Sequence, residues 1–192
     1  MPDLQNIQSN LGDLIVKVAK ERAESYGQMY AKNQAPISPY KNLTSNALPE
    51  ESVLFWLRGL SKCNQFIGDV LTKAGLKMPT FKMKDGSEHY MNAERLPKEK
   101  NYFSKVCNLN DLRAGDLIVL DNLARRGENG AHVELVSSVN LRKNLLSLIG
   151  ARSDGAAERQ SFLLGELVAS SNCGFYRSSR KEMIYFLRSR LQ

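Results

Sequence analysis

The chain has 192 residues, 42% of them hydrophobic, and a formal net charge of +7. This length suits one domain with its own core, and the ordinary hydrophobic share argues against a disordered chain. The sequence has no apolar run of about 18 residues and no secretory signal at its start, so we expect cytoplasmic synthesis and no transmembrane segment. The positive charge favours an anionic partner in general terms, although a well-solvated surface explains it equally well.

Apolar residues at helical spacing predict a first helix from Leu4 to Tyr30, with an interruption near Gly12. Residues 33–51 contain three prolines among asparagine and serine, which predicts a loop. The short apolar segment that follows contains Trp56, the only tryptophan of the chain.

A second helix is predicted from about Lys62 to Ala74. Ser61 is a suitable N-cap and Gly75 a suitable C-cap, and apolar residues recur at helical spacing between them. Cys63 therefore falls in the first turn of this helix. Residues 78–109 combine two prolines with many charges, so we expect a surface excursion with at most short helices.

The second half of the chain favours strands. Gly115 and Asp116 form a turn into the first of them, and His132 opens another that alternates polar and apolar residues. The predicted strands are 117–120, 132–136, 145–151 and 183–187. Helices followed by an antiparallel sheet define an α+β protein.

Cys63 and His132 are the candidate catalytic pair. A thiol attacks only as the thiolate, which the first turn of a helix favours through its unpaired N–H groups and its dipole. Cys63 is predicted to lie there, beside the positive charge of Lys62. Histidine suits the role of general base near neutral pH. His132 is the stronger candidate, because His89 lies in an expected loop.

The remaining cysteines are Cys107 and Cys173. An odd total without CxxC spacing argues against a disulfide framework or a zinc site, and we expect no metal and no cofactor. Cys107 and Cys173 could pair in an oxidising compartment, which the sequence leaves open.

Three segments together resemble the NlpC-type cysteine peptidases and their CHAP relatives. They are residues 62–71 with the cysteine, 112–119 with the Gly-Asp turn and 130–136 with the histidine. The resemblance implies a papain-like α+β fold in which the nucleophile helix packs on a small antiparallel sheet. We expect a single catalytic domain over 1–192, with an N-terminal helical extension of about 1–33 and a core of about 52–155.

The chain departs from the family pattern at the third catalytic residue. The family places a polar residue on the strand after the histidine, and the matching position here holds Gly150. We assign the role to Asp154, with Ser153, Glu134 or a backbone carbonyl as alternatives.

Two further residues are predicted to bind substrate. Asn64 stands where the family commonly has serine after the nucleophile, and Trp56 could line the substrate cleft. Core packing is the competing interpretation for Trp56. Lys62 stands where the family usually has aspartate before the nucleophile.

The resemblance implies hydrolysis of amide bonds in the stem peptides of peptidoglycan. A small basic wall hydrolase without a signal must be delivered to the wall. This resembles interbacterial amidase effectors, which act in the periplasm of a target cell, or phage lysins. An injected effector also implies a cognate immunity protein as partner.

Two alternatives remain. The same fold supports a deamidase, an acyltransferase or a protease that acts on a protein substrate. The net charge alone would suit a nucleic-acid binder, but the chain lacks a recognisable reading motif, so no nucleic-acid partner is expected.

Overall fold

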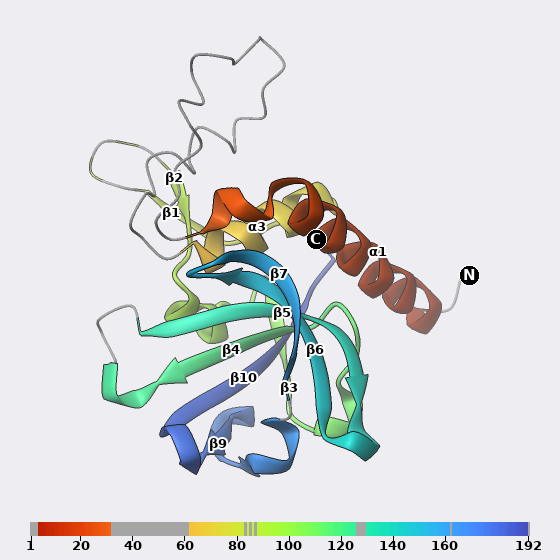
Figure 1. Cartoon of the computed structure of the whole chain (residues 1–192), viewed down its shortest axis with the longest axis vertical. Helices are drawn as coiled ribbons and strands as arrows, with labels where there is room; N and C mark the ends of the chain where they lie inside the picture. Colours follow the sequence, from red (N-terminus) through yellow and green to blue (C-terminus); the bar gives the residue numbers. More distant parts are fainter. Residues whose placement is uncertain are drawn as a thin grey trace.

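The computed structural model describes residues 4–31, 62–82, 84, 86, 88–125, 130–161 and 163–191. Two α-helices, α1 (Leu4–Tyr26) and α3 (Cys63–Lys73), lie together on one side of a large, curved antiparallel sheet (Figure 1). A 3₁₀ turn, η1 (Gly27–Tyr30), continues α1. The α+β class is therefore observed.

The large sheet has eight strands in the order β7-β6-β5-β4-β10-β9-β8, and β3 pairs with β10 beside this path. Its strands are β3 (Phe103–Val106), β4 (Leu117–Asn122), β5 (Ala131–Asn140), β6 (Leu145–Arg152), β7 (Gly155–Ser161), β8 (Leu167–Ala169), β9 (Phe175–Arg177) and β10 (Glu182–Ser189). Because β10 pairs with β4 on one side and with β3 and β9 on the other, this late strand is central to the sheet.

Shorter elements lie before and between these strands. β1 (Thr80–Lys82) and β2 (Glu88–Tyr90) form a separate two-stranded sheet. The 3₁₀ turns are η2 (Ala93–Lys98), η3 (Leu109–Asp111), η4 (Leu123–Arg125), η5 (Leu141–Lys143), η6 (Leu163–Glu166), η7 (Ser171–Cys173) and η8 (Ser178–Arg180).

The buried side chains form two clusters, and alternation along the strands divides them. Leu117 and Val119 of β4 belong to the cluster that contains the apolar face of α3, whereas Ile118 between them belongs to the second cluster. Successive strand residues point to opposite faces, so both faces of the sheet bury apolar surface. The first cluster also contains Ile15, Val18, Ala19 and Tyr30, which makes α1 and η1 part of the core.

Several expectations from the sequence are confirmed. The second helix, the strands β4, β5 and β6, and the last strand lie where the sequence predicts them, within one or two residues at most ends. The sheet extends past residue 155, where we expected the core to end, through β7 to β10.

Two expectations about local structure are wrong. α1 runs through Gly12 without interruption. Residues 78–109 are not only a surface excursion, because they form β1, β2 and β3, and they bury Leu96 and Phe103. The loop predicted at 33–51, Ser61 and the apolar segment with Trp56 lie outside the described residues.

Cys107 and Cys173 form a disulfide with a Cα–Cα distance of 4.4 Å. The bond connects the end of β3 to η7, across a sequence separation of 66 residues. The pairing that the sequence left open is therefore present in the structure. Across the residues described, no helix has both the length and the apolar character that a membrane crossing requires.

Gly12 marks the point where α1 crosses the turn before β4. A Cβ atom on Gly12 would lie 2.4 Å from the carbonyl oxygen of Ala114, and one on Gly115 would lie 2.5 Å from the Cα of Gly12. Gly115 also has a φ of +88°, in the left-handed region that glycine adopts at least cost. The absence of two side chains therefore permits backbone contact between the helix and the turn.

We expect Gly12→Ala to lower the free energy of unfolding by about 1–2 kcal/mol, because the added methyl group overpacks a backbone contact. Helix propensity alone predicts the opposite sign, a gain of about 1 kcal/mol. Urea denaturation measures the change. Asp13→Ala, on the exposed side of the same helix, is the matched control and should leave stability nearly unchanged. A stabilised Gly12→Ala protein would contradict this close approach.

Candidate active site

The structure brings Cys63 and His132 together. Cys63 is the first residue of α3. The first turn of this helix contains a hydrogen bond from the Phe66 N–H to the Lys62 carbonyl at 2.9 Å. His132 is the second residue of β5, opposite Leu120 of β4. The side chains of Cys63 and His132 interact, and this interaction is one of the effects that raise the pKa of His132. The two residues that sequence reasoning selected, 69 positions apart, therefore meet where the helix begins.

A buried carboxylate lies on the other side of the imidazole. Glu134 follows His132 by two residues on β5, and its side chain is fully buried. Its Oε1 lies 3.3 Å from Nε2 of His132. Nε2 has no well-aligned hydrogen-bond acceptor among the described residues, so we interpret this contact as mainly charge–charge attraction. Because Nε2 faces Glu134, Nδ1 is the ring nitrogen that remains for other partners.

Arg152 completes this row of side chains. Its Nε donates to Oε1 of Glu134 at 2.7 Å, and its Nη2 donates to Oε2 at 2.9 Å. This two-point geometry fixes the plane of the carboxylate. His132, Glu134 and Arg152 thus form one hydrogen-bonded and ion-paired row that spans β5 and β6.

The electrostatics of the row favour its charged forms. Burial by itself lowers the pKa of His132, but the interactions with Cys63 and Glu134 outweigh burial and raise this pKa to about 9. Burial raises the pKa of Glu134, but His132 and Arg152 outweigh that effect and lower it to about 2. Near neutral pH the site therefore contains an imidazolium and a carboxylate.

Gly150 makes room for the carboxylate. A Cβ atom at this position would lie 2.5 Å from Cγ and 3.1 Å from Oε1 of Glu134. Gly150 is the residue at which the resemblance described above leads us to expect a third polar residue. In this chain the space is occupied by Glu134, which approaches the histidine from the same strand.

Asp154, the residue that we assigned to the third position, is paired with Arg159 in the structure, whereas Glu134 lies beside His132. Asp154 is exposed at the turn between β6 and β7, where its Oδ1 accepts a hydrogen bond from Arg159 at 2.7 Å. Glu134, one of the alternatives from the sequence, contacts His132 instead. The sequence feature that indicates this arrangement is Gly150 on one strand, together with a glutamate two residues after the histidine on the neighbouring strand.

A cavity of about 350 Å³ opens beside His132. Its lining includes charged residues of both signs (Lys62, Arg152, Arg180 and Glu182) together with the apolar residues Leu120 and Ala151. The His132 side chain is 26% exposed, whereas Cys63 is only 3% exposed. The imidazole is thus the member of the pair that is more open to solvent.

Other residues singled out by the sequence have structural contacts. The Asn64 side chain donates to the carbonyl of Tyr90 at 3.0 Å and so connects α3 to β2. His89 lies in β2 opposite Phe81. Trp56 lies outside the described residues. Within the described chain, no group of three or more histidine, cysteine, aspartate or glutamate residues is placed to hold a metal ion.

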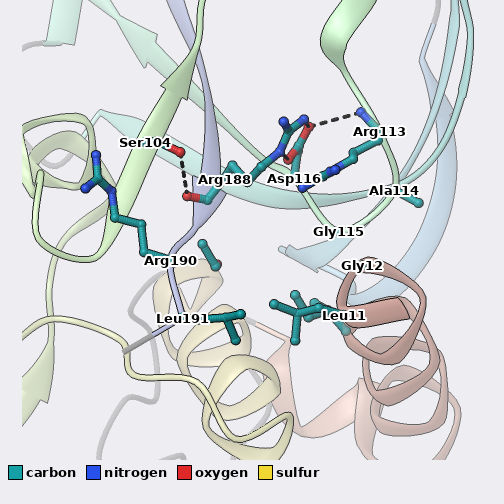
Figure 2. Close-up of a pocket in the computed structure, with 12 residues that line it drawn as sticks. Leu11, Gly12, Ser104, Arg113, Ala114, Gly115, Asp116, Arg188, Arg190 and Leu191 are labelled. Carbon is teal, nitrogen blue, oxygen red and sulfur yellow. Dashed lines mark hydrogen bonds and ion pairs between the residues drawn. The ribbon is translucent and has the colours of Figure 1, made fainter. Parts of the chain in front are cut away.

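A slightly larger cavity, of about 380 Å³, lies between α1, the Gly-Asp turn and the end of β10 (Figure 2). Asp116 in its wall forms a two-point ion pair with Arg188, with both contacts at 2.8 Å, and accepts the Arg113 N–H at 3.0 Å. These contacts fix the turn. The lining contains neither cysteine nor histidine, so this cavity is separate from the Cys63 site.

The titration of His132 tests this geometry without any substrate. We expect its ring protons to titrate near pH 9 by proton NMR, with an assignment from His89→Gln, because the chain has only two histidines. Cys63→Ala should move the His132 midpoint to lower pH, since interaction with the sulfur helps to hold the proton. An unchanged midpoint in Cys63→Ala would mean that the two side chains do not interact.

Outside comparisons do not extend the description of this site. In comparisons with protein-family models, curated proteins and solved structures, no match to the chain was found. The description of the site therefore depends on this chain's own geometry.

Proposed function

We propose that the protein is a cysteine hydrolase that cleaves amide bonds in the stem peptides of peptidoglycan. The observation that carries the proposal is a cysteine at the start of a helix that interacts with a histidine, whose protonated form is stabilised by a buried carboxylate. Cys63 is the nucleophile, His132 is the general acid and base, and Glu134 orients the imidazole. The fold supports a papain-like arrangement through its nucleophile helix packed against an antiparallel sheet.

The chemistry follows from the protonation states. The Cys63 thiolate attacks the carbonyl carbon, and the unpaired N–H groups of the first turn of α3 stabilise the negative oxygen of the tetrahedral intermediate. The His132 imidazolium donates its proton to the departing amine, and a thioester remains. Water then gives a proton to the neutral imidazole as it attacks the thioester. Collapse of this second intermediate releases the carboxylic acid and restores the starting pair.

The Glu134–Arg152 pair holds the imidazole in a productive orientation. A carboxylate beside the ring stabilises the imidazolium that takes part in both half-reactions. Arg152 in turn prevents the buried carboxylate from taking up a proton, because it supplies two charge-assisted hydrogen bonds. The row therefore keeps one proton on the histidine over a wide pH range.

Three properties support the wall as the substrate. The net charge of +7 favours approach to an anionic polymer. The cavity beside His132 combines charged and apolar groups and is of a size that suits part of a short peptide. The Cys107–Cys173 disulfide suits an oxidising compartment such as the periplasm. We propose action there after delivery as an injected effector or a lysin, and an injected effector would require an immunity protein in the producing cell.

Digestion of purified muropeptides is the direct test. The wild-type protein should give fragments whose masses sum to the parent plus one water, and Cys63→Ala should give none. Asp154→Asn is the matched control and should retain activity, because its side chain contacts Arg159 rather than His132. Intact muropeptides with the wild-type protein would contradict the wall substrate. Mass changes in added proteins under the same conditions would favour the deamidase, acyltransferase or protease alternative.

The role of Glu134 predicts a pH effect. The alkaline limb of kcat/KM should lie near pH 9, where His132 loses its proton. Glu134→Gln removes the negative charge, so the limb should move down by about one pH unit or more. The plateau value should fall by roughly 10²- to 10⁴-fold, the range for lost acid–base assistance. An unmoved limb would exclude Glu134 as the partner of His132.

Gly150→Ala provides a second variant that keeps the carboxylate but displaces it. We expect its alkaline limb to move in the same direction as in Glu134→Gln. Gly165→Ala is the control, because the three atoms nearest to a methyl group there all belong to the Asn144 side chain, the nearest at 3.2 Å.

A further inference from the structure

Lys62, the residue before the nucleophile, is a buried cation. It is 2% exposed, and its Nζ donates to the carbonyl of Ala31 at 2.8 Å and to that of Met29 at 3.1 Å. Both carbonyls lie where η1 ends, and carbonyl groups at the end of a helical segment carry partial negative charge. The ammonium group therefore connects the first turn of α3 to the end of the α1–η1 unit.

Burial of the Lys62 ammonium group costs desolvation free energy, which a residue with a merely structural function need not incur. Burial lowers the pKa of the Lys62 amine, because the charged form loses hydration. An apolar side chain could fill a buried position without that desolvation cost. The retained charge is thus a feature that packing alone does not explain. Lys62 also lines the same cavity as His132.

A second buried contact fixes α3 to the same unit farther along the helix. Arg22 of α1 donates from Nη2 to Asp69 of α3 at 3.0 Å, and both side chains are almost fully buried. Tyr30 donates to the same carboxylate at 2.5 Å, and Gln65 donates to its other oxygen at 2.7 Å. The Lys62 contacts are a further set of buried polar contacts between α3 and the α1–η1 unit, at the beginning of the helix.

We propose that Lys62 is a positioning residue of the Cys63 site, which fixes the first turn of α3 against the carbonyls of Met29 and Ala31 and supplies a positive charge at the residue that precedes the nucleophile. The inference rests on the proposed function, in which Cys63 acts as the nucleophile. It assigns the α1–η1 unit a part in assembling the site, rather than the role of an extension. A cation next to a cysteine favours the reactive anion.

The charged groups around the sulfur make the effect measurable. His132 interacts with it directly, and Glu134 and Arg152 lie beyond the imidazole. Asp69 farther along α3 is paired with Arg22. These groups are unchanged in a Lys62 variant, so a shift in the reactivity of Cys63 reports on Lys62.

The test is the rate of alkylation by iodoacetamide as a function of pH, with the intact chain. Cys107 and Cys173 are joined in the disulfide, so Cys63 is the thiol that remains to react. Lys62→Met should lower the rate at pH 6 by about tenfold, equivalent to an upward shift of about one unit in the pH midpoint of the reaction. Lys62→Arg, which keeps the charge, should recover most of the rate.

Lys105→Met is the matched control. Lys105 also donates to a backbone carbonyl, that of Asn172 at 3.0 Å, and burial lowers its pKa as well, but it lies near the disulfide rather than near Cys63. Its removal should leave the alkylation profile unchanged. Circular dichroism establishes that each variant is folded. If Lys62→Met does not fold, Lys62→Gln replaces it, because an amide still donates to a carbonyl but carries no charge.

A folded Lys62→Met or Lys62→Gln protein with the wild-type alkylation profile would overturn the inference. This result is distinguishable from failure of the proposed function, because alkylation needs no substrate. Intact muropeptides together with a Lys62-dependent profile would reject the wall substrate and leave the positioning role in place. Cleaved muropeptides with an alkylation profile independent of Lys62 would support the wall substrate and reject the positioning role.

Discussion

The site depends on one buried charge, the carboxylate of Glu134. An ionised carboxylate without water is strongly unfavourable unless cations and hydrogen bonds compensate it. Here the compensation comes from Arg152 on one side and from protonated His132 on the other. The same requirement that keeps the carboxylate buried and charged therefore keeps a proton on the histidine, next to the sulfur of Cys63. Packing and chemistry are coupled at this point.

The surrounding fold serves this arrangement from both sides. The sheet holds His132 and Glu134 at fixed register on β5, and α3 presents Cys63 at its first residue. The helix itself is attached to α1 and η1 through buried polar contacts rather than through apolar packing alone. Polar contacts are directional, so they define the position of the helix along its axis more narrowly than apolar contacts do. The proposed catalytic pair comes from two distant segments, and its chemistry needs this accuracy.

Much of this could be predicted from the sequence, and the limits have physical causes. The second helix and the strand of His132 follow from local spacing and caps, so the pair Cys63–His132 was accessible. The sequence could not select Glu134 rather than Asp154 as the carboxylate beside His132. That choice depends on the pairing of β5 with β6 and on the absent side chain of Gly150. Likewise, the uninterrupted helix at Gly12 reflects a tertiary contact with Ala114 that no local pattern contains. The strand β7, with its alanines and charged residues, has low intrinsic strand propensity and forms through its pairing with β6.

The disulfide has a consequence for where the molecule is most stable. The bond closes a loop across 66 residues, which include the strands β4 to β8. On the loop-entropy account, closing a loop of this length restricts the unfolded chain enough to stabilise the native state by about 4 kcal/mol. That contribution is absent while the thiols are reduced. The same polypeptide is consequently easier to unfold under reducing conditions than under oxidising ones, and formation of the bond increases its resistance to heat and proteolysis.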